Sequence, residues 1–347
     1  MALRGTTELV ILPTYRELAE TTVSLADELE ALESSGAGAD SASELERVDL
    51  GPARRAYLDV RLPLGESQAF AFGPAVDLHS ESKLDAAPIE AEKVDAALNG
   101  DGALDVKGVR LLGADKRGLH GIEYLLFPEG DADVEAALLA DDEAGRRRRR
   151  YLSSAARVVA DAARELVEAW EPENGDYGAR FSQPGGPDSV NDTVQPGLDT
   201  LLNECVYLSE IVANRKLGDP LGVTSGGDVD PAAQESERSG ASLADMLSNL
   251  RGMRNIYLGS RDGSAVPSLS SLVRGKSPAT DRRVRDAFDA AEASLLAIPE
   301  PLSSALDEAP STVNDAYESV KQLKQVLATE VLSTLGASLK FSDNDGD

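Results

Sequence analysis

The sequence predicts an all-α fold. Aromatic residues make up only 4% of the 347 residues, alanine and leucine are abundant, and runs of β-branched residues are scarce. This balance favours helix over sheet. Apolar residues near the start of the chain recur at roughly helical spacing: Leu9, Leu12, Leu18, Leu25, Leu29 and Leu32. Several long helices with short connections in each half predict helical bundles.

The first half is expected to contain two long helices before its middle and shorter ones after it. Pro52 and Pro63 interrupt the second helical pattern, because proline lacks the backbone donor that a helix interior needs. The predicted helices span about residues 6–33, 44–72, 118–127, 132–142 and 151–170, with loops at 34–43 and a mixed region at 75–115.

Residues 171–188 hold three prolines and four glycines, which is typical of a linker. We therefore expect an N-terminal domain at 1–175 and a C-terminal domain at 186–342. Helices are predicted in the second half at about 189–215, 234–257, 278–298 and 311–339, with loops at 222–230 and 259–266 and a frayed acidic tail from 342.

The charge balance excludes several partners. With 61 acidic and 34 basic residues, the net charge is −27, and such a surface repels nucleic acids and anionic membranes. The five arginines at 146–150 follow three acidic residues, so we expect a solvated, self-neutralising helix surface. No apolar run is long enough to cross a membrane, and Cys205 alone cannot form an internal disulfide. Residues 1–7 lack the apolar core of an export signal, which leaves the cellular location open.

The segment Gly118-Leu119-His120-Gly121-Ile122-Glu123 carries the strongest chemical signal. At a spacing of three, His120 and Glu123 project from one face of a helix. They can share a metal ion, or one can orient the other. Gly118 and Gly121 lower helix stability, so we expect another backbone or a ligand to approach closely there.

The pair alone does not make a zinc protease. The H-E-x-x-H pattern is absent, since Gly121 and Tyr124 stand at two of its positions. A catalytic zinc would need a third ligand and a separate base, whereas an oxygen-rich iron site is easier to assemble from abundant carboxylates. The alternative is a buried histidine bonded to a glutamate that joins two helices. No Walker loop, G-x-S-x-G elbow or Cys/His nucleophile pair is present.

Two further segments place polar residues where they could line a site. In residues 61–74, Arg61 and Gln68 stand among leucines and phenylalanines and need partners if buried; an ordinary amphipathic helix is the alternative. In residues 234–239, the side chains of Glu235, Ser236 and Ser239 could line a polar cleft or cap the helix that follows.

These motifs together resemble the imelysin-like family. Its signature G-x-H-x-x-E stands here as Gly118, His120 and Glu123, followed by Tyr-Leu-Leu-Phe. Four further segments occur in the same order as in the family: the first helix, the arginine-to-FGP stretch at 61–74, the arginine-leucine turn near Arg215 and the ES-x-x-S segment. The similarity therefore covers nearly the whole chain. The chain departs from the family at Gln68, where glutamate is common, and near Arg215, where one residue is inserted before the leucine.

The resemblance implies two four-helix-bundle-like domains packed against each other, with the motif at their interface. It implies an exported protein, in the periplasm or on the cell surface. This protein would be associated with iron uptake and would have other iron-uptake components as partners. We expect a non-enzymatic protein that binds iron, another divalent metal or a metal-bearing small ligand. His120 and Glu123 would be its metal residues, and the binding residues would be Arg61, Gln68, Gly118, Arg215, Glu235, Ser236 and Ser239. A metallopeptidase and a structural or partner-binding helical protein are the alternatives.

Overall fold

The computed structural model describes residues 2–37, 49–128 and 132–339, and within these ranges every regular element is a helix. The predicted all-α fold is therefore confirmed. Part of the loop predicted at 34–43, the start of the helix predicted from 44 and the tail from 342 lie outside the described residues. None of the described helices combines the length and the apolar character needed to cross a membrane.

The chain divides into two compact units. Unit 1 comprises Met1–Thr14, Leu62–Gly73 and Glu168–Asp347, and unit 2 comprises Tyr15–Arg61 and Pro74–Val167. This division differs from the sequence boundary between 175 and 186, because three long helices continue from one unit into the other. The expectation that 1–175 and 186–342 fold as separate domains stays a prediction.

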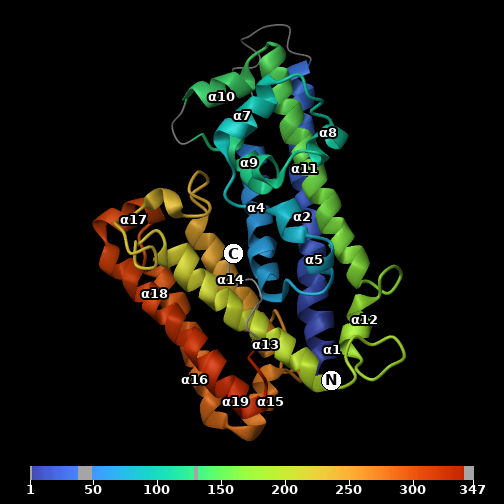
Figure 1. The fold of residues 1–347 in the computed structure, drawn as a ribbon, viewed down its shortest axis with the longest axis vertical. Coiled ribbons are helices and arrows are strands. Elements are labelled where there is room, and N and C mark those ends of the chain that lie inside the picture. The colour runs from blue at the N-terminus through green and yellow to red at the C-terminus, as the bar shows by residue number, and fades with distance from the viewer. Residues whose placement is uncertain (1, 38–48, 129–131, 340–347) are drawn as a thin grey trace. The chain divides into compact units, whose positions relative to one another are not determined.

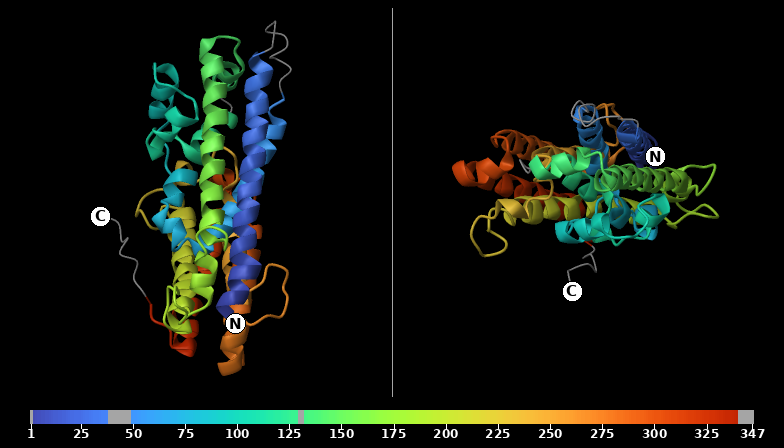
Figure 2. Two further views of the ribbon diagram at one scale, coloured as in Figure 1. Left: turned by 90° about the vertical axis from the view of Figure 1, so that its right-hand side faces the viewer. Right: turned by 90° about the horizontal axis from the view of Figure 1, so that it is seen from above.

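The long helices of unit 2 are α2 (Leu12–Ala37), α4 (Gly51–Ser67) and α11 (Glu143–Trp170). The first residues of α2 and the last residues of α4 and α11 belong to unit 1. Helices α2 and α11 run side by side (Figures 1 and 2), and Arg157 of α11 pairs with Glu30 and Asp27 of α2. The shorter elements are α5 (Pro74–Asp77), α6 (Ser80–Leu84), α7 (Ala91–Asn99), α8 (Val106–Arg110), η3 (Ala114–Lys116), α9 (Gly118–Leu126) and α10 (Ala132–Leu139).

The arginine run lies inside α11, which begins eight positions earlier than the helix predicted from residue 151. The expectation of a solvated surface is wrong for Arg149, which is 1% exposed. Its Nη1 donates to the carbonyl oxygens of Leu138 and Ala140. Arg149 thus satisfies acceptors at the C-terminal end of α10, where a cation is favoured.

Unit 1 is built around a bundle of four helices. They are α13 (Val194–Glu210), α14 (Ser242–Leu258), α16 (Pro278–Leu296) and α18 (Pro310–Gln325), which pack pairwise and are drawn from yellow to red in Figure 1. The remaining elements are α1 (Ala2–Thr6), η1 (Thr7–Ile11), η2 (Gln68–Phe70), α12 (Tyr177–Ser182), η4 (Ile211–Gly218), η5 (Pro231–Ala233), α15 (Leu269–Lys276), α17 (Leu302–Glu308), η6 (Val326–Val331) and α19 (Leu332–Leu335).

Two segments of unit 1 differ from the sequence expectation. Residues 177–182 of the predicted linker form α12, and Phe181 packs its ring against Trp170 and Phe72. This segment is therefore part of an aromatic core. Helix α14 begins at Ser242 rather than near 234, and the residues before it form turns. Those turns carry Glu235 and Ser236.

Candidate metal site

Helix α9 carries His120, and two glycines allow its neighbours to approach closely. Gly118 has a φ of +79°, and an added Cβ would lie 2.9 Å from the carbonyl oxygen of Leu84 in α6. At Gly121, an added Cβ would clash with the Tyr151 hydroxyl group of α11, which donates to the Lys116 carbonyl. The sequence analysis expected another backbone or a ligand to approach the glycines. Backbone does so at Gly118, whereas a side chain approaches Gly121 instead.

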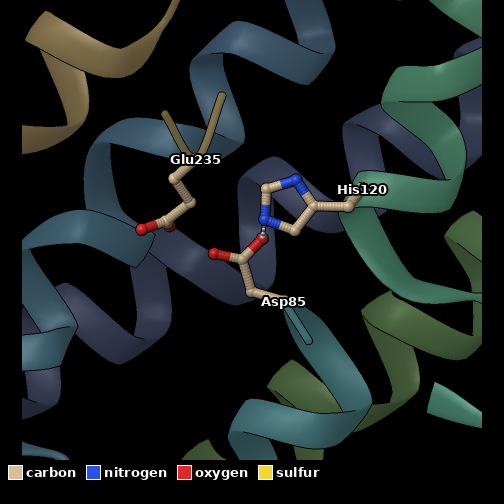
Figure 3. Close-up of side chains that lie close together, drawn as sticks. All are labelled: Asp85, His120 and Glu235. Carbon is tan, nitrogen blue, oxygen red and sulfur yellow. Dashed lines mark ion pairs between the residues drawn. The ribbon is translucent and has the colours of Figure 1, made fainter. Parts of the chain in front are cut away.

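The two nitrogens of His120 face different carboxylates. Nδ1 lies 3.0 Å from Oε2 of Glu123 on the same helix, as the spacing of three predicts. Nε2 lies 3.3 Å from Oδ1 of Asp85, the residue that ends α6, and Figure 3 shows the imidazole facing this carboxylate. All three side chains are about 4% exposed. Nε2 makes no hydrogen bond with any described residue.

Arg61 of α4 reaches the same carboxylate. Its Nη1 donates to Oδ1 of Asp85 at 2.6 Å, and both side chains are buried. A buried carboxylate needs such a partner, since burial of an uncompensated charge is costly. We call the four side chains Arg61, Asp85, His120 and Glu123 the row. Their net charge is zero when the imidazole is protonated and −1 when it is neutral.

The pKa of His120 is raised above its ordinary value. Burial acts to lower it, but the negative charge of Asp85 and the hydrogen bond to Glu123 together outweigh burial, although the positive charge of Arg61 opposes them. The group therefore holds a proton more tightly than a free imidazole. Asp85 thus takes part in setting the protonation of the motif histidine.

Unit 1 gathers the other predicted polar residues around a buried lysine. The Lys216 ammonium group, in η4, lies 3.0 Å from Oε2 of Glu235 and donates to Oε1 of Gln68 at 3.4 Å. The same oxygen of Gln68 accepts a 2.8 Å hydrogen bond from Asn249 of α14. Asn249 also donates to the carbonyl of Gly65, where α4 and α14 approach closely. Gln68 thus acts as an acceptor for two donors.

The remaining predicted binding residues of unit 1 lie apart from this cluster or at its edge. Arg215 is exposed, and the structure brings its neighbour Lys216, not Arg215, to Glu235. Ser236 is fully buried and donates to Oδ2 of Asp245, which fixes the turn before α14. Ser239 is half-buried in the same turn. Ser236 therefore anchors the segment that carries Glu235.

Sequence reasoning missed Asp85 and Lys216. Asp85 lies after a short helix and is distant from His120 along the chain, so no local spacing connects them. The signal for Lys216 was present: Lys216-Leu217-Gly218-Asp219-Pro220 has the basic-Leu-Gly-x-Pro order of the family turn without an insertion. Read in this way, the basic position of the turn falls on Lys216.

Comparisons with a family model and with a known protein point to the same family. Residues 11–329 match the family model described as imelysin, Peptidase_M75. The chain is 26% identical over 307 residues to iron-regulated protein A of Synechococcus elongatus, covering 88% of this chain and 77% of that protein.

Two crystal structures share the fold. A putative iron-regulated protein A precursor from Parabacteroides distasonis superposes with a TM-score of 0.81 at 23% identity, covering 96% of this chain and 94% of that one. An imelysin-like protein from Psychrobacter arcticum gives a TM-score of 0.74 at 18% identity, with 98% of both chains covered.

Proposed function

The chain belongs to the imelysin family, and from this premise we propose that it is a non-enzymatic protein that binds iron or another divalent metal, or a metal-bearing small ligand, at His120. The observation that carries the proposal is the environment of Nε2. This atom is buried, makes no hydrogen bond with the described residues and faces a buried carboxylate oxygen. A buried polar atom in that state calls for an explanation, and a metal ion supplies one.

The donor pair fits a transition metal. Metal–nitrogen and metal–oxygen bonds to zinc are about 2.1 Å long, so two ligand atoms at the tetrahedral angle lie about 3.4 Å apart. Nε2 of His120 and Oδ1 of Asp85 are separated by 3.3 Å. Imidazole and carboxylate together suit iron and zinc. When bound, the metal would supply a positive charge that offsets the net −1 of the row with neutral His120.

In this proposal Glu123 orients His120 rather than binding the metal with it. Glu123 accepts a hydrogen bond from Nδ1, which fixes the tautomer that leaves Nε2 as the ligand. Carboxylates commonly hold metal-binding histidines in this way and raise their basicity. Arg61 orients Asp85 in the same way, because its guanidinium group donates a hydrogen bond to Oδ1 of the carboxylate.

The sequence resemblance implies Glu235 as a further binding residue. Within unit 1, Lys216 pairs with Glu235 and donates to Gln68. Replacing Glu235 with glutamine removes the charge but keeps the shape. We expect this change to weaken metal binding severalfold, and unchanged affinity would remove Glu235 from the proposed site.

The proposal of iron rests on the relatives. The Synechococcus elongatus protein is named iron-regulated protein A, and the sequence resemblance connects the family with iron uptake. We extend this to the present chain, together with export to the periplasm or cell surface and a role alongside other iron-uptake components. Fractionation of cells that express the natural gene tests the location.

The experiment that tests binding is metal analysis of protein purified without a histidine tag. Wild-type protein dialysed against Fe²⁺ or Zn²⁺ is expected to retain about one equivalent, and His120→Ala is expected to lose most of it. Peptide cleavage is assayed on the same samples with and without chelator. Equal metal retention by both proteins would contradict the proposal, and chelator-sensitive cleavage that depends on His120 would favour a metallopeptidase.

A further inference from the structure

Residues 263–285, where α15 ends and α16 begins, are basic in an acidic protein. They contain five basic side chains and one acidic side chain, Asp281, which gives the segment a net charge of +4. The whole chain carries −27, so the remaining residues carry −31. The two helices meet at one end of the bundle in unit 1, where α15 also packs against α14 and α19 (Figure 1).

Three of the five cations form no ion pair with any described residue. They are Arg274 and Lys276 of α15 and Arg282 of α16, and all three are exposed. The other two have counter-ions, because Arg283 pairs with Glu330 and Arg285 pairs with Asp281. We call the three exposed side chains without a counter-ion the basic corner.

The neighbouring carboxylates do not cancel the charge of the basic corner. Asp281 is buried and accepts hydrogen bonds from neighbouring side chains, and Asp286, one turn after Arg282, is exposed. When Asp281, Asp286 and Glu330 are all counted against the five basic residues, the net charge is still +2. The positive sign of this surface therefore does not depend on where its edge is drawn.

The arginine run at 146–150 is also basic in sequence, but its side chains have partners in the structure. Two of its arginines pair with carboxylates, two donate to backbone carbonyl oxygens, and one is buried. The basic corner differs because its cations face solvent and are free to meet an anionic partner.

The surface at the basic corner is open and carries an exposed apolar side chain. Nothing lies within 4 Å of a Cβ added at Gly275, between Arg274 and Lys276, so no neighbouring segment covers this position. Leu272 is 39% exposed and lies one turn before Lys276, on the same face of α15. Outward-facing cations beside an exposed leucine match a lipid layer, which offers anionic headgroups above an apolar interior.

We propose that the basic corner is a docking surface for the anionic headgroups of a lipid membrane. Such headgroups attract lysine and arginine side chains that come close to them. The repulsion expected from the net charge applies to the rest of the surface, and the Debye length of about 10 Å at 0.1 M salt largely screens carboxylates that lie farther than that from the membrane. The corner is thus the part of unit 1 that would face an anionic membrane. The inference depends neither on the proposed metal site nor on the proposed location.

The test is co-sedimentation of the full chain with lipid vesicles at low ionic strength. One set of vesicles is phosphatidylcholine alone, and the other contains an equal part of phosphatidylglycerol. The main variant is Arg274→Gln/Lys276→Gln. The matched control is Arg55→Gln/Lys107→Gln, which removes one exposed arginine and one exposed lysine of unit 2 and changes the net charge equally. Thermal unfolding checks that each variant is folded.

We expect wild type and the control variant to sediment with the mixed vesicles but not with phosphatidylcholine alone. Arg274→Gln/Lys276→Gln should lower the affinity about tenfold. Salt at about 1 M should release wild type, because it shortens the Debye length to about 3 Å.

Three results would overturn the proposal. Equal affinity of the two double variants would remove the basic corner from the contact. Release by inorganic phosphate at constant ionic strength would indicate a site for a single phosphate ion. Failure of wild type to bind the mixed vesicles would exclude a membrane and leave an acidic protein as the partner of this surface.

Discussion

Nε2 of His120 lies 3.3 Å from Oδ1 of Asp85, and that same oxygen accepts a hydrogen bond from Arg61. One buried carboxylate oxygen thus faces a permanent cation and a titratable imidazole. In the proposed metal site, neutral His120 would bind the ion through Nε2, whereas protonated His120 forms an ion pair with Asp85. The proposal therefore has proton and metal competing for one nitrogen.

Replacement of Arg61 with methionine should destabilise the protein by about 3–5 kcal/mol, because it breaks a buried ion pair by removing the permanent cation beside Asp85. Urea unfolding followed by circular dichroism measures the change. The matched control is Arg55→Met on the same helix, where the side chain is exposed and the effect should stay within about 0.5 kcal/mol. Equal unfolding midpoints for the two variants would show that the Arg61–Asp85 pair contributes little.

Gly118→Ala should cost at least about 1 kcal/mol of stability. The residue has a φ of +79°, and its Cβ would lie 2.9 Å from the Leu84 carbonyl, so both strain and a clash oppose the change. Gly102→Ala is the control, since nothing lies within 4 Å of an added Cβ there. Thermal unfolding compares the two variants. A Gly118 variant as stable as the Gly102 variant would contradict the described start of α9.

The raised pKa of His120 makes the stability of the metal-free protein depend on pH. Because the folded state holds the proton more tightly than the unfolded state, this contribution is fully present below about pH 6.5. It is lost as the pH rises through the higher folded pKa. The difference in unfolding free energy between wild type and His120→Gln should therefore shrink as the pH rises. A difference independent of pH would argue against the Asp85–His120 ion pair.

Glu204 should also make the protein less stable as the pH rises, but its pKa is raised by burial, whereas charged and hydrogen-bonding partners raise that of His120. Burial raises the pKa of Glu204 to about 7, so between about pH 4.5 and 7 the folded state holds a proton that the unfolded state has lost. Stability falls as the pH rises through this window. Glu204→Gln should therefore be more stable than wild type at pH 8 and similar at pH 4.5, by chemical unfolding at both values. Glu28→Gln, at an exposed position of α2, should show no such difference.

The sequence predicted the helical fold because its signals are local. Helical spacing of leucines and scarcity of β-branched runs determine helix type without knowledge of the fold. The geometry of His120 and Glu123 follows from a spacing of three in the same way. Helix starts were less well predicted: α11 begins at Glu143 because the arginine run is itself helical.

Long-range partners could not be predicted from one sequence. Asp85 meets His120 only because Gly118 lets the start of α9 approach the end of α6. The burial of Arg149 depends likewise on where α10 ends. The sequence analysis made no assignment for Asp85 and expected Arg149 on a solvated surface. Only the packing of helices gives the two residues their partners.

Calorimetric titration of Fe²⁺, without oxygen, and of Zn²⁺ into metal-free wild type and His120→Ala tests the central proposal most directly. His79→Asn is the control, because His79 is the only other histidine, is exposed and has a φ of 51°, which asparagine tolerates. We expect His120→Ala to bind at least tenfold more weakly than wild type, about 1.4 kcal/mol, and His79→Asn to bind as wild type does. Equal affinity of wild type and His120→Ala would contradict a metal site at His120 and favour a role for the histidine in joining helices.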